Sequence, residues 1–204
     1  MNWKYNNPLQ NVFTYAAILF LVTGCIFLYF INRESVFLYL NNQHTHIGDL
    51  LFKYFTHVGD GLFMIAASVF VFFIGKRKLA LLLILSFLVS GLFVQVLKRV
   101  NEKPRPGLFF KNPLQVHKVD GEILKGNNSF PSGHTTTAFA MFSLFSFATR
   151  KKELQLLFFL SALFIGYSRI YLGQHFFEDV LAGAAIGFFT SFVLMWLFRK
   201  KEWE

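Results

Sequence analysis

The chain has 204 residues, of which 54% are hydrophobic, 19% aromatic and only 15% charged, a composition too apolar for an ordinary soluble domain. Its net charge of +9 does not indicate nucleic-acid binding, because half of the 20 basic residues lie in short segments beside apolar runs and seven more lie in one segment, 98–125. We therefore expect a single integral membrane domain over residues 1–204.

Uncharged apolar runs divide the chain into six candidate membrane spans. A helix needs roughly 17–25 apolar residues to cross the hydrocarbon core, and two of the runs, 61–75 and 154–168, are shorter than that range. The first run is expected to be an uncleaved span, because no small-residue cleavage site follows it. The sequence predicts an all-α membrane protein, a bundle of six transmembrane helices with short interfacial helices, the runs being 12–32, 61–75, 79–97, 132–149, 154–168 and 180–198.

Basic residues indicate the orientation of this bundle. With six spans, the N-terminus, loops 75–78 and 149–153 and the C-terminal tail share one side and carry ten Lys and Arg residues. The other side also carries ten, but seven of them fall in the long segment 98–125, which weighs less. We expect both termini to be cytoplasmic and the membrane to be a bacterial inner membrane.

The external segment 33–60 contains an amphipathic pattern at helical spacing. Its two faces hold Ile47, Leu50, Leu51, Tyr54, Phe55 and Val58 on one side and Asp49, Lys53 and His57 on the other. A helix lying in the outer interface and a helix packed on the bundle explain the pattern equally well. His44, His46 and His57 resemble metal ligands by residue type, but nothing completes a tetrahedral set, so we expect no metal there.

The stretch KRVNEKPRP leaves the third run. It places Lys98 and Arg105 seven residues apart, and Pro104 and Pro106 restrict the backbone on both sides of Arg105. Two cations in this place are either interfacial anchors or ligands of an anion.

A basic loop follows at 107–128. Asp120-Gly121 lies between two short alternating runs and predicts a hairpin that could cover a site as a lid. The lysines of this loop would attract an anionic headgroup; they are Lys111, Lys118 and Lys125.

The stretch SFPSGHTTT enters the fourth run. Ser132 and Gly133 precede an apolar helix, whose N-terminal amides bind phosphate readily. Ser132 is equally well explained as a helix cap. His134 would lie in the first turn, beside the bound anion.

The stretch SRIYLGQHFFEDV joins the last two runs with almost no room for a loop. Gly173 allows a tight turn. His175 and Asp179 are i and i+4, so they share a helix face if the helix begins near His175. A carboxylate bonded to one imidazole nitrogen leaves the other free as a nucleophile; Glu178, at i+3, satisfies the same spacing. Acids that complement a helix dipole explain both carboxylates but leave Arg169 and His175 unexplained.

Topology brings these three clusters to one face of the membrane. Their cations, helix N-terminus and two histidines suit phosphoryl transfer, in which catalysis is mostly positioning and charge stabilisation. One histidine can attack phosphorus and the other can protonate the leaving oxygen. The sequence has no cluster of carboxylates for Mg²⁺ and no Cys/His set for zinc, so we expect no cofactor.

The three clusters together resemble the signature of the type 2 phosphatidic acid phosphatase superfamily. The matching parts are Lys98 with Arg105-Pro106, then Pro131-Ser132-Gly133-His134, then Ser168-Arg169 with His175 and Asp179. The resemblance implies that His175 forms a phosphohistidine, that Asp179 orients it and that His134 is the general acid. It also implies that the phosphate oxygens are held by Lys98, Arg105, Ser132, Gly133 and Arg169.

A membrane phosphatase acting on a lipid phosphate at the external leaflet is the function that this resemblance implies. Undecaprenyl diphosphate, phosphatidylglycerol phosphate, phosphatidic acid and lipid A are all candidate substrates. A phosphatase for water-soluble phosphate esters would use the same residues and stays open. A transporter would need ionisable groups in mid-span, which the runs lack, and a membrane-embedded bundle disfavours a vanadate haloperoxidase.

Overall fold

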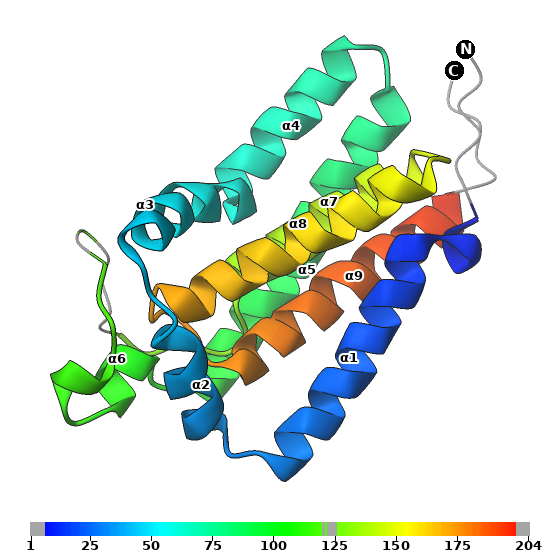
Figure 1. The fold of residues 1–204 in the computed structure, drawn as a ribbon. Helices are drawn as coiled ribbons and strands as arrows, with labels where there is room; N and C mark the ends of the chain where they lie inside the picture. Colours follow the sequence, from blue (N-terminus) through cyan, green and yellow to red (C-terminus); the bar gives the residue numbers. More distant parts are fainter. Residues whose placement is uncertain (1–6, 120, 122–125, 199–204) are drawn as a thin grey trace.

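The computed structural model describes residues 7–119, 121 and 126–198, and this part of the chain is helical, without a strand. The predicted all-α architecture is therefore confirmed (Figure 1). In chain order the α-helices and 3-10 helices (η) are η1 (Pro8–Gln10), α1 (Val12–Phe30), α2 (Arg33–Asn41), α3 (His46–Phe55), η2 (Thr56–Gly59), α4 (Gly61–Phe73), α5 (Arg77–Asn101), α6 (Pro106–Phe109), η3 (Pro113–Gln115), α7 (Gly133–Phe147), α8 (Lys152–Tyr171) and α9 (Phe177–Phe198).

Each of the six apolar runs forms a helix, namely α1, α4, α5, α7, α8 and α9. In the described residues, four of the segments are long and apolar enough to cross a membrane: α1, α5 continued through α6, α8 and α9. A fifth span results if α3–η2 and α4, which are bent by 60°, form one broken span. The predicted number of six is thus not confirmed, because α7 has 15 residues and α4 has 13.

Helix α7 is short because it lies inside the bundle, packed against α5, α8 and α9 (Figure 1). Eleven of its 15 residues are buried. A helix surrounded by protein meets other side chains rather than lipid along most of its length, so the membrane thickness does not set its length in the way it does for a lipid-facing span. Run 132–149 is therefore a central helix of the bundle.

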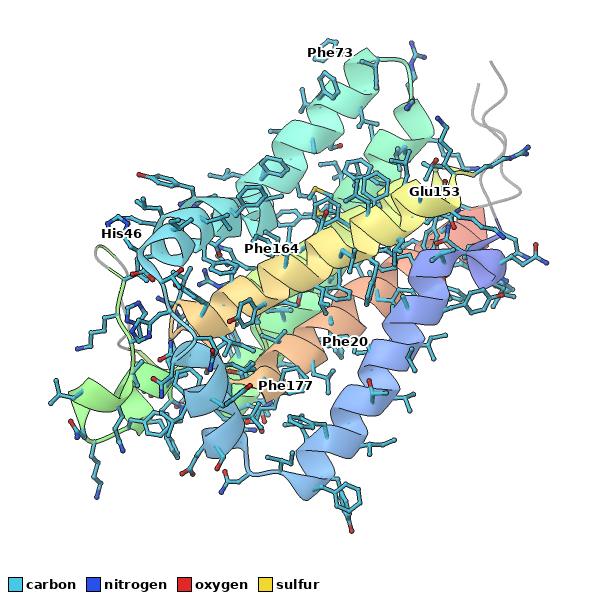
Figure 2. All side chains as sticks on the ribbon, viewed as in Figure 1. Phe20, His46, Phe73, Glu153, Phe164 and Phe177 are labelled. Carbon is cyan, nitrogen blue, oxygen red and sulfur yellow. The ribbon has the colours of Figure 1, made fainter. Side chains whose placement is uncertain are left out.

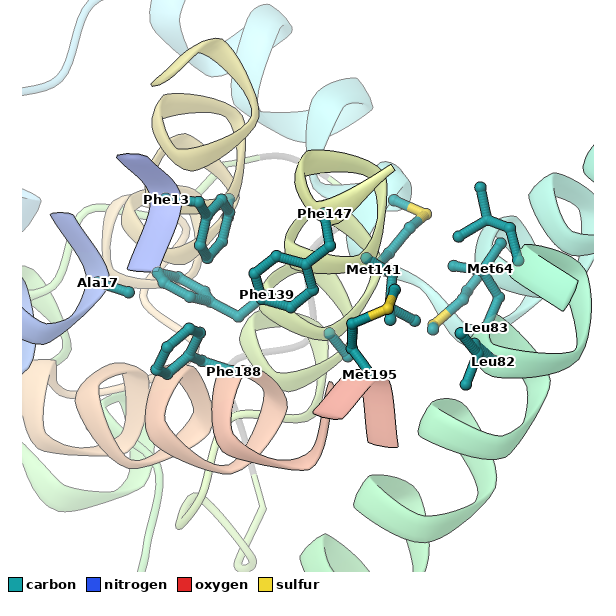
Figure 3. Packing of buried hydrophobic residues seen from close by; sticks show 14 of the residues in the cluster. Phe13, Ala17, Met64, Leu82, Leu83, Phe139, Met141, Phe147, Phe188 and Met195 are labelled. Carbon is teal, nitrogen blue, oxygen red and sulfur yellow. The ribbon is translucent and has the colours of Figure 1, made fainter. Parts of the chain in front are cut away.

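Aromatic rings from three helices pack together along the centre of the bundle. Phe13 of α1 packs between Phe139 of α7 and Phe188 of α9, with ring centroids 6.0 and 6.2 Å away (Figure 3). Nearer the other end of α1, Phe20 meets Phe177 at the start of α9 at 6.1 Å (Figure 2). These ring pairs join three helices that are distant in sequence.

Polar side chains fasten one end of the bundle, where α1 begins and α7 passes into α8 (Figure 1). Asn11 Nδ2 donates to the carbonyl of Ser146 at 3.1 Å, and the amide of Val12 donates to Gln155 Oε1 at 3.0 Å. The start of α1 therefore lies beside loop 149–153, as the topology predicted. The α8–α9 turn, α2 and α6 lie at the opposite end.

Helices α2 and α3 cover this second end. The predicted apolar face of α3 is exposed, with Ile47 at 76% and Tyr54 at 66%, whereas Phe52 is buried against α8. Asp49 on the same helix accepts a hydrogen bond from the hydroxyl of Tyr171, the last residue of α8, at 2.7 Å. Helix α3 thus packs on the bundle by one side, as one of the two alternatives predicted, and leaves its apolar face outward, so its location in the outer interface stays a prediction.

Candidate active site

The three predicted clusters meet at the end of the bundle covered by α2 and α3. Lys98, in the last turns of α5, lies near enough to Arg105, Arg169 and Asp179 for their charges to act on it. His134, in the first turn of α7, is likewise near the charged or titratable side chains of Arg169, His175, Lys98 and His57. Residues of all three clusters therefore lie close together in space, although 81 positions separate Lys98 from Asp179 in the sequence.

The α8–α9 turn is made by one backbone group. The carbonyl of Arg169 accepts from the amides of Gln174 and His175 at 3.0 and 3.1 Å, and Gly173 supplies a φ of +69°. Arg169, His175 and Asp179 are 6%, 2% and 0% exposed, so this turn brings three ionisable groups into the interior. The absence of a longer loop is explained by this turn.

Asp179 is the carboxylate that meets His175. Its Oδ2 lies 3.4 Å from His175 Nδ1, which is a long hydrogen bond. The same oxygen accepts from the amide of Phe176 at 2.9 Å and from Ser129 Oγ at 2.5 Å. An imidazole that donates from Nδ1 carries its lone pair on Nε2.

Glu178 has other partners, although it is the neighbouring residue. Its Oε1 accepts from Arg33 at 2.9 Å and from Lys103 at 3.3 Å. The Arg33 guanidinium also lies 4.9 Å from the ring centroid of Phe109 and 5.0 Å from that of Phe176. Glu178 therefore links α9 to α2 and to the segment between α5 and α6.

The imidazole of His175 is held in its neutral form. Burial lowers the pKa of His175 to about 4, although the Asp179 carboxylate favours the charged form. Near neutral pH a ring nitrogen is therefore available as a base or nucleophile.

The start of α7 is tied to this pair. Ser132 is the N-cap of α7, and its Oγ accepts from the hydroxyl of Thr135 at 2.9 Å and from the amide of Thr135 at 3.4 Å. The Ser132 amide donates to the carbonyl of Asp179 at 3.0 Å. A Cβ at Gly133 would meet no atom within 4 Å, so the backbone of the first helical residue faces open space. The capping role of Ser132 is present, and a helix N-terminus of this kind attracts anions.

Arg105 reaches the site from the segment after α5. It is the N-cap residue of α6, between two prolines, and its guanidinium donates to the buried Gln174 Oε1. Its amide donates to the carbonyl of Gly126 at 3.0 Å. Asp120 and residues 122–125, on which the predicted hairpin and Lys125 fall, lie outside the described residues.

Three residues that the sequence did not single out contact the site. Ser129 bonds Asp179, Gln174 bonds Arg105, and Thr56 Oγ1 accepts from Arg169 Nη1 at 2.6 Å. Ser129 lies two residues before Pro131 and Gln174 precedes His175, so proximity to a motif was a usable signal for both. Thr56 stands outside every motif, at the end of a segment interpreted as an amphipathic helix.

Among the described residues there is no group of three or more His, Cys, Asp or Glu placed to hold a metal ion. His44 of the external segment stacks on His117, with ring centroids 3.8 Å apart.

Known proteins resemble this chain over most of its length. The family model of the PAP2 superfamily matches residues 79–203. Lipid A 1-phosphatase of Rhizobium johnstonii is 30% identical over 179 residues, which are 76% of this chain and 68% of that protein. Phosphatidylglycerophosphatase B of Bacillus subtilis is 31% identical over 152 residues, which are 68% of this chain and 70% of that protein.

A solved structure shares the fold. The crystal structure of a transmembrane PAP2-type phosphatidylglycerolphosphate phosphatase from Bacillus subtilis superposes with a TM-score of 0.70 at 24% identity. The match covers 96% of this chain and 98% of the other. The helical architecture therefore corresponds to a transmembrane fold over almost the whole chain.

Proposed function

The chain belongs to the PAP2 superfamily of phosphoric ester hydrolases and is an integral membrane protein, and we propose that it removes phosphate from a lipid at the external leaflet. The observation that carries this proposal is the buried His175–Asp179 pair beside Lys98, Arg105, Arg169 and the start of α7. A neutral imidazole among fixed cations is suited to attack a phosphate whose negative charge those cations hold.

The proposed reaction has two steps. Nε2 of His175 bonds to phosphorus while the bond from phosphorus to the lipid oxygen breaks, and that oxygen takes a proton from His134, which is in its imidazolium form when the phosphate anion is bound. Water, losing a proton to His134, then attacks the phosphohistidine, which releases inorganic phosphate and restores His175. Asp179 accepts the Nδ1 proton's hydrogen bond throughout, at the 3.4 Å contact, and so orients the ring.

In this proposal the remaining site residues bind phosphate oxygens. Lys98, Arg105 and Arg169 supply positive charge, and Ser132 and the amide of Gly133 supply the helix N-terminus. Open space at Gly133 supports a close approach of the anion to the backbone.

A lipid substrate is supported by the setting of the site. The site lies at the end of membrane-spanning helices, and α3, which has an exposed apolar face, packs on α8 and on η2. The relatives are named for lipid A and for phosphatidylglycerophosphate. The short basic loops 75–78 and 149–153 lie at the other end of the bundle, which supports an external site and cytoplasmic termini.

Phosphate release from purified protein tests the proposal. The panel consists of lipid A, phosphatidylglycerol phosphate, phosphatidic acid, undecaprenyl diphosphate and a water-soluble ester such as p-nitrophenyl phosphate. We expect turnover of at least one lipid that persists in EDTA and is inhibited by vanadate, which resembles five-coordinate phosphorus.

Two controls separate this proposal from its alternatives. The His175→Ala variant should release no phosphate but should still bind lipid. Phosphate release by that variant would contradict the assignment of His175 as the nucleophile. Turnover of the soluble ester alone would favour the soluble-substrate function, and a strict requirement for Mg²⁺ would contradict the mechanism.

A further inference from the structure

The 3-10 turn η2 forms a contact with the phosphate-binding side of the site that no motif contains. Thr56, the first residue of η2, is 2% exposed, and its Oγ1 accepts from Arg169 Nη1 at 2.6 Å. We propose that Thr56 is a positioning residue, which fixes the Arg169 guanidinium in the orientation that binds a phosphate oxygen. This proposal rests on the phosphatase function proposed above.

A chain of hydroxyl groups holds Thr56 in this role. Ser168 Oγ lies 3.2 Å from Thr56 Oγ1 and 2.6 Å from the carbonyl of Ile165. Ser168 Oγ directs its one hydrogen toward both Thr56 Oγ1 and the Ile165 carbonyl, and Thr56 Oγ1 also accepts from the Arg169 guanidinium. A lone pair of Thr56 Oγ1 therefore faces the guanidinium, and the backbone of α8 anchors this series of hydrogen bonds.

The turn itself is held in place by close packing. A Cβ at Gly59, the last residue of η2, would lie 2.6 Å from Ile165 Cγ2, 2.9 Å from the His134 carbonyl oxygen and 3.2 Å from His134 Cβ. Only a residue without a side chain lets η2 lie this near to both α7 and α8. Thr56 is thus presented to Arg169 from a segment with little room to move.

Arginine has several rotatable bonds, and a buried guanidinium in a fixed direction loses less freedom when it binds an anion. Removing the Thr56 hydroxyl should therefore weaken anion binding by about tenfold, the loss expected for one hydrogen bond to a charged group. The loss should appear in KM and in vanadate inhibition more than in melting temperature.

Three variants test this in the full-length protein in detergent. Thr56→Val removes the hydroxyl at similar volume, Thr56→Ser retains it, and Ser68→Ala removes a buried hydroxyl that bonds the Ala80 carbonyl at 2.8 Å, away from the site. We expect about tenfold weaker vanadate binding for Thr56→Val, near-wild-type binding for Thr56→Ser, and no change for Ser68→Ala. Thr56→Ala serves as the second hydroxyl-free variant if Thr56→Val does not fold.

Calorimetric titration with vanadate measures binding without turnover. Folded Thr56→Val or Thr56→Ala protein that binds vanadate like the wild type would overturn the positioning role, as would an equal loss in Thr56→Ser. A wild-type protein that binds vanadate but releases phosphate from no substrate would instead contradict the proposed function, so the two failures are distinguishable.

Discussion

Residues 178 and 179 are neighbouring acids with different surroundings. Asp179 is fully buried, and one of its oxygens accepts from His175, Phe176 and Ser129. The side chain of Glu178 is 23% exposed, and it pairs with Arg33 and Lys103. Partly exposed ion pairs contribute little to stability, whereas a carboxylate that orients a nucleophilic imidazole acts on the reaction itself.

Comparison of Asp179→Asn with Glu178→Gln tests this difference. Asp179→Asn should lower kcat by about 10³-fold or more, because the amide no longer fixes the tautomer of His175. Glu178→Gln should change kcat by less than about threefold, since it removes only partly exposed ion pairs. Steady-state phosphate release measures both, and a larger loss in Glu178→Gln would reverse the assignment.

The close contact between helices α7 and α9 supports the site. A Cβ at Gly183 would lie 2.6 Å from the Ser132 carbonyl oxygen, and one at Gly187 would meet the Thr136 carbonyl and, at 2.9 Å, the Ala140 amide nitrogen. Small residues let membrane helices approach closely. This approach places the backbone carbonyl of Asp179, at the start of α9, within hydrogen-bonding distance of the Ser132 amide.

Gly187→Val should force these helices apart. Overpacking of this kind costs about 1–3 kcal/mol, so we expect a lower melting temperature in detergent together with lower activity. Gly91→Ala is the matched control, because a Cβ at Gly91 in α5 would meet no atom within 4 Å. A melting temperature for Gly187→Val equal to that of Gly91→Ala would contradict the role of this contact.

Charge at the two ends of the whole molecule predicts its orientation. Loop 149–153 adjoins the start of α1, and the candidate site lies at the opposite end. Because short basic segments remain in the cytoplasm, the site should face the outside.

Reporter fusions test this orientation. A reporter active only in the cytoplasm should be active when it follows Glu204 and inactive when it is inserted between α2 and α3. A silent C-terminal fusion in a strain that expresses the protein would invert the topology.

Patterns over short distances made much of this molecule predictable. Apolar runs located the six helices of the bundle, because a lipid or protein interior requires apolar side chains along each helix. The i and i+4 spacing of His175 and Asp179 predicted that they share a helix face. The chain was predicted to cross the membrane an even number of times between one polar cluster and the next, which places all three clusters on the same side. These properties depend on neighbouring residues and on chain direction, which a sequence displays.

Contacts between residues that are distant in the sequence become visible only in the folded chain. Ser129 lies 50 residues from Asp179, and Thr56 lies 113 residues from Arg169, so no local spacing connects them. The resemblance already favoured Asp179 over Glu178, but the pairing of Glu178 with Arg33, 145 residues away, appears only in the structure. Run 132–149 has the length of a span, but its 15-residue helix is central because α5, α8 and α9 surround it. The order of residues shows which groups are available for chemistry, whereas packing selects the partner that each group meets, because that partner depends on the helix–helix contacts formed on folding.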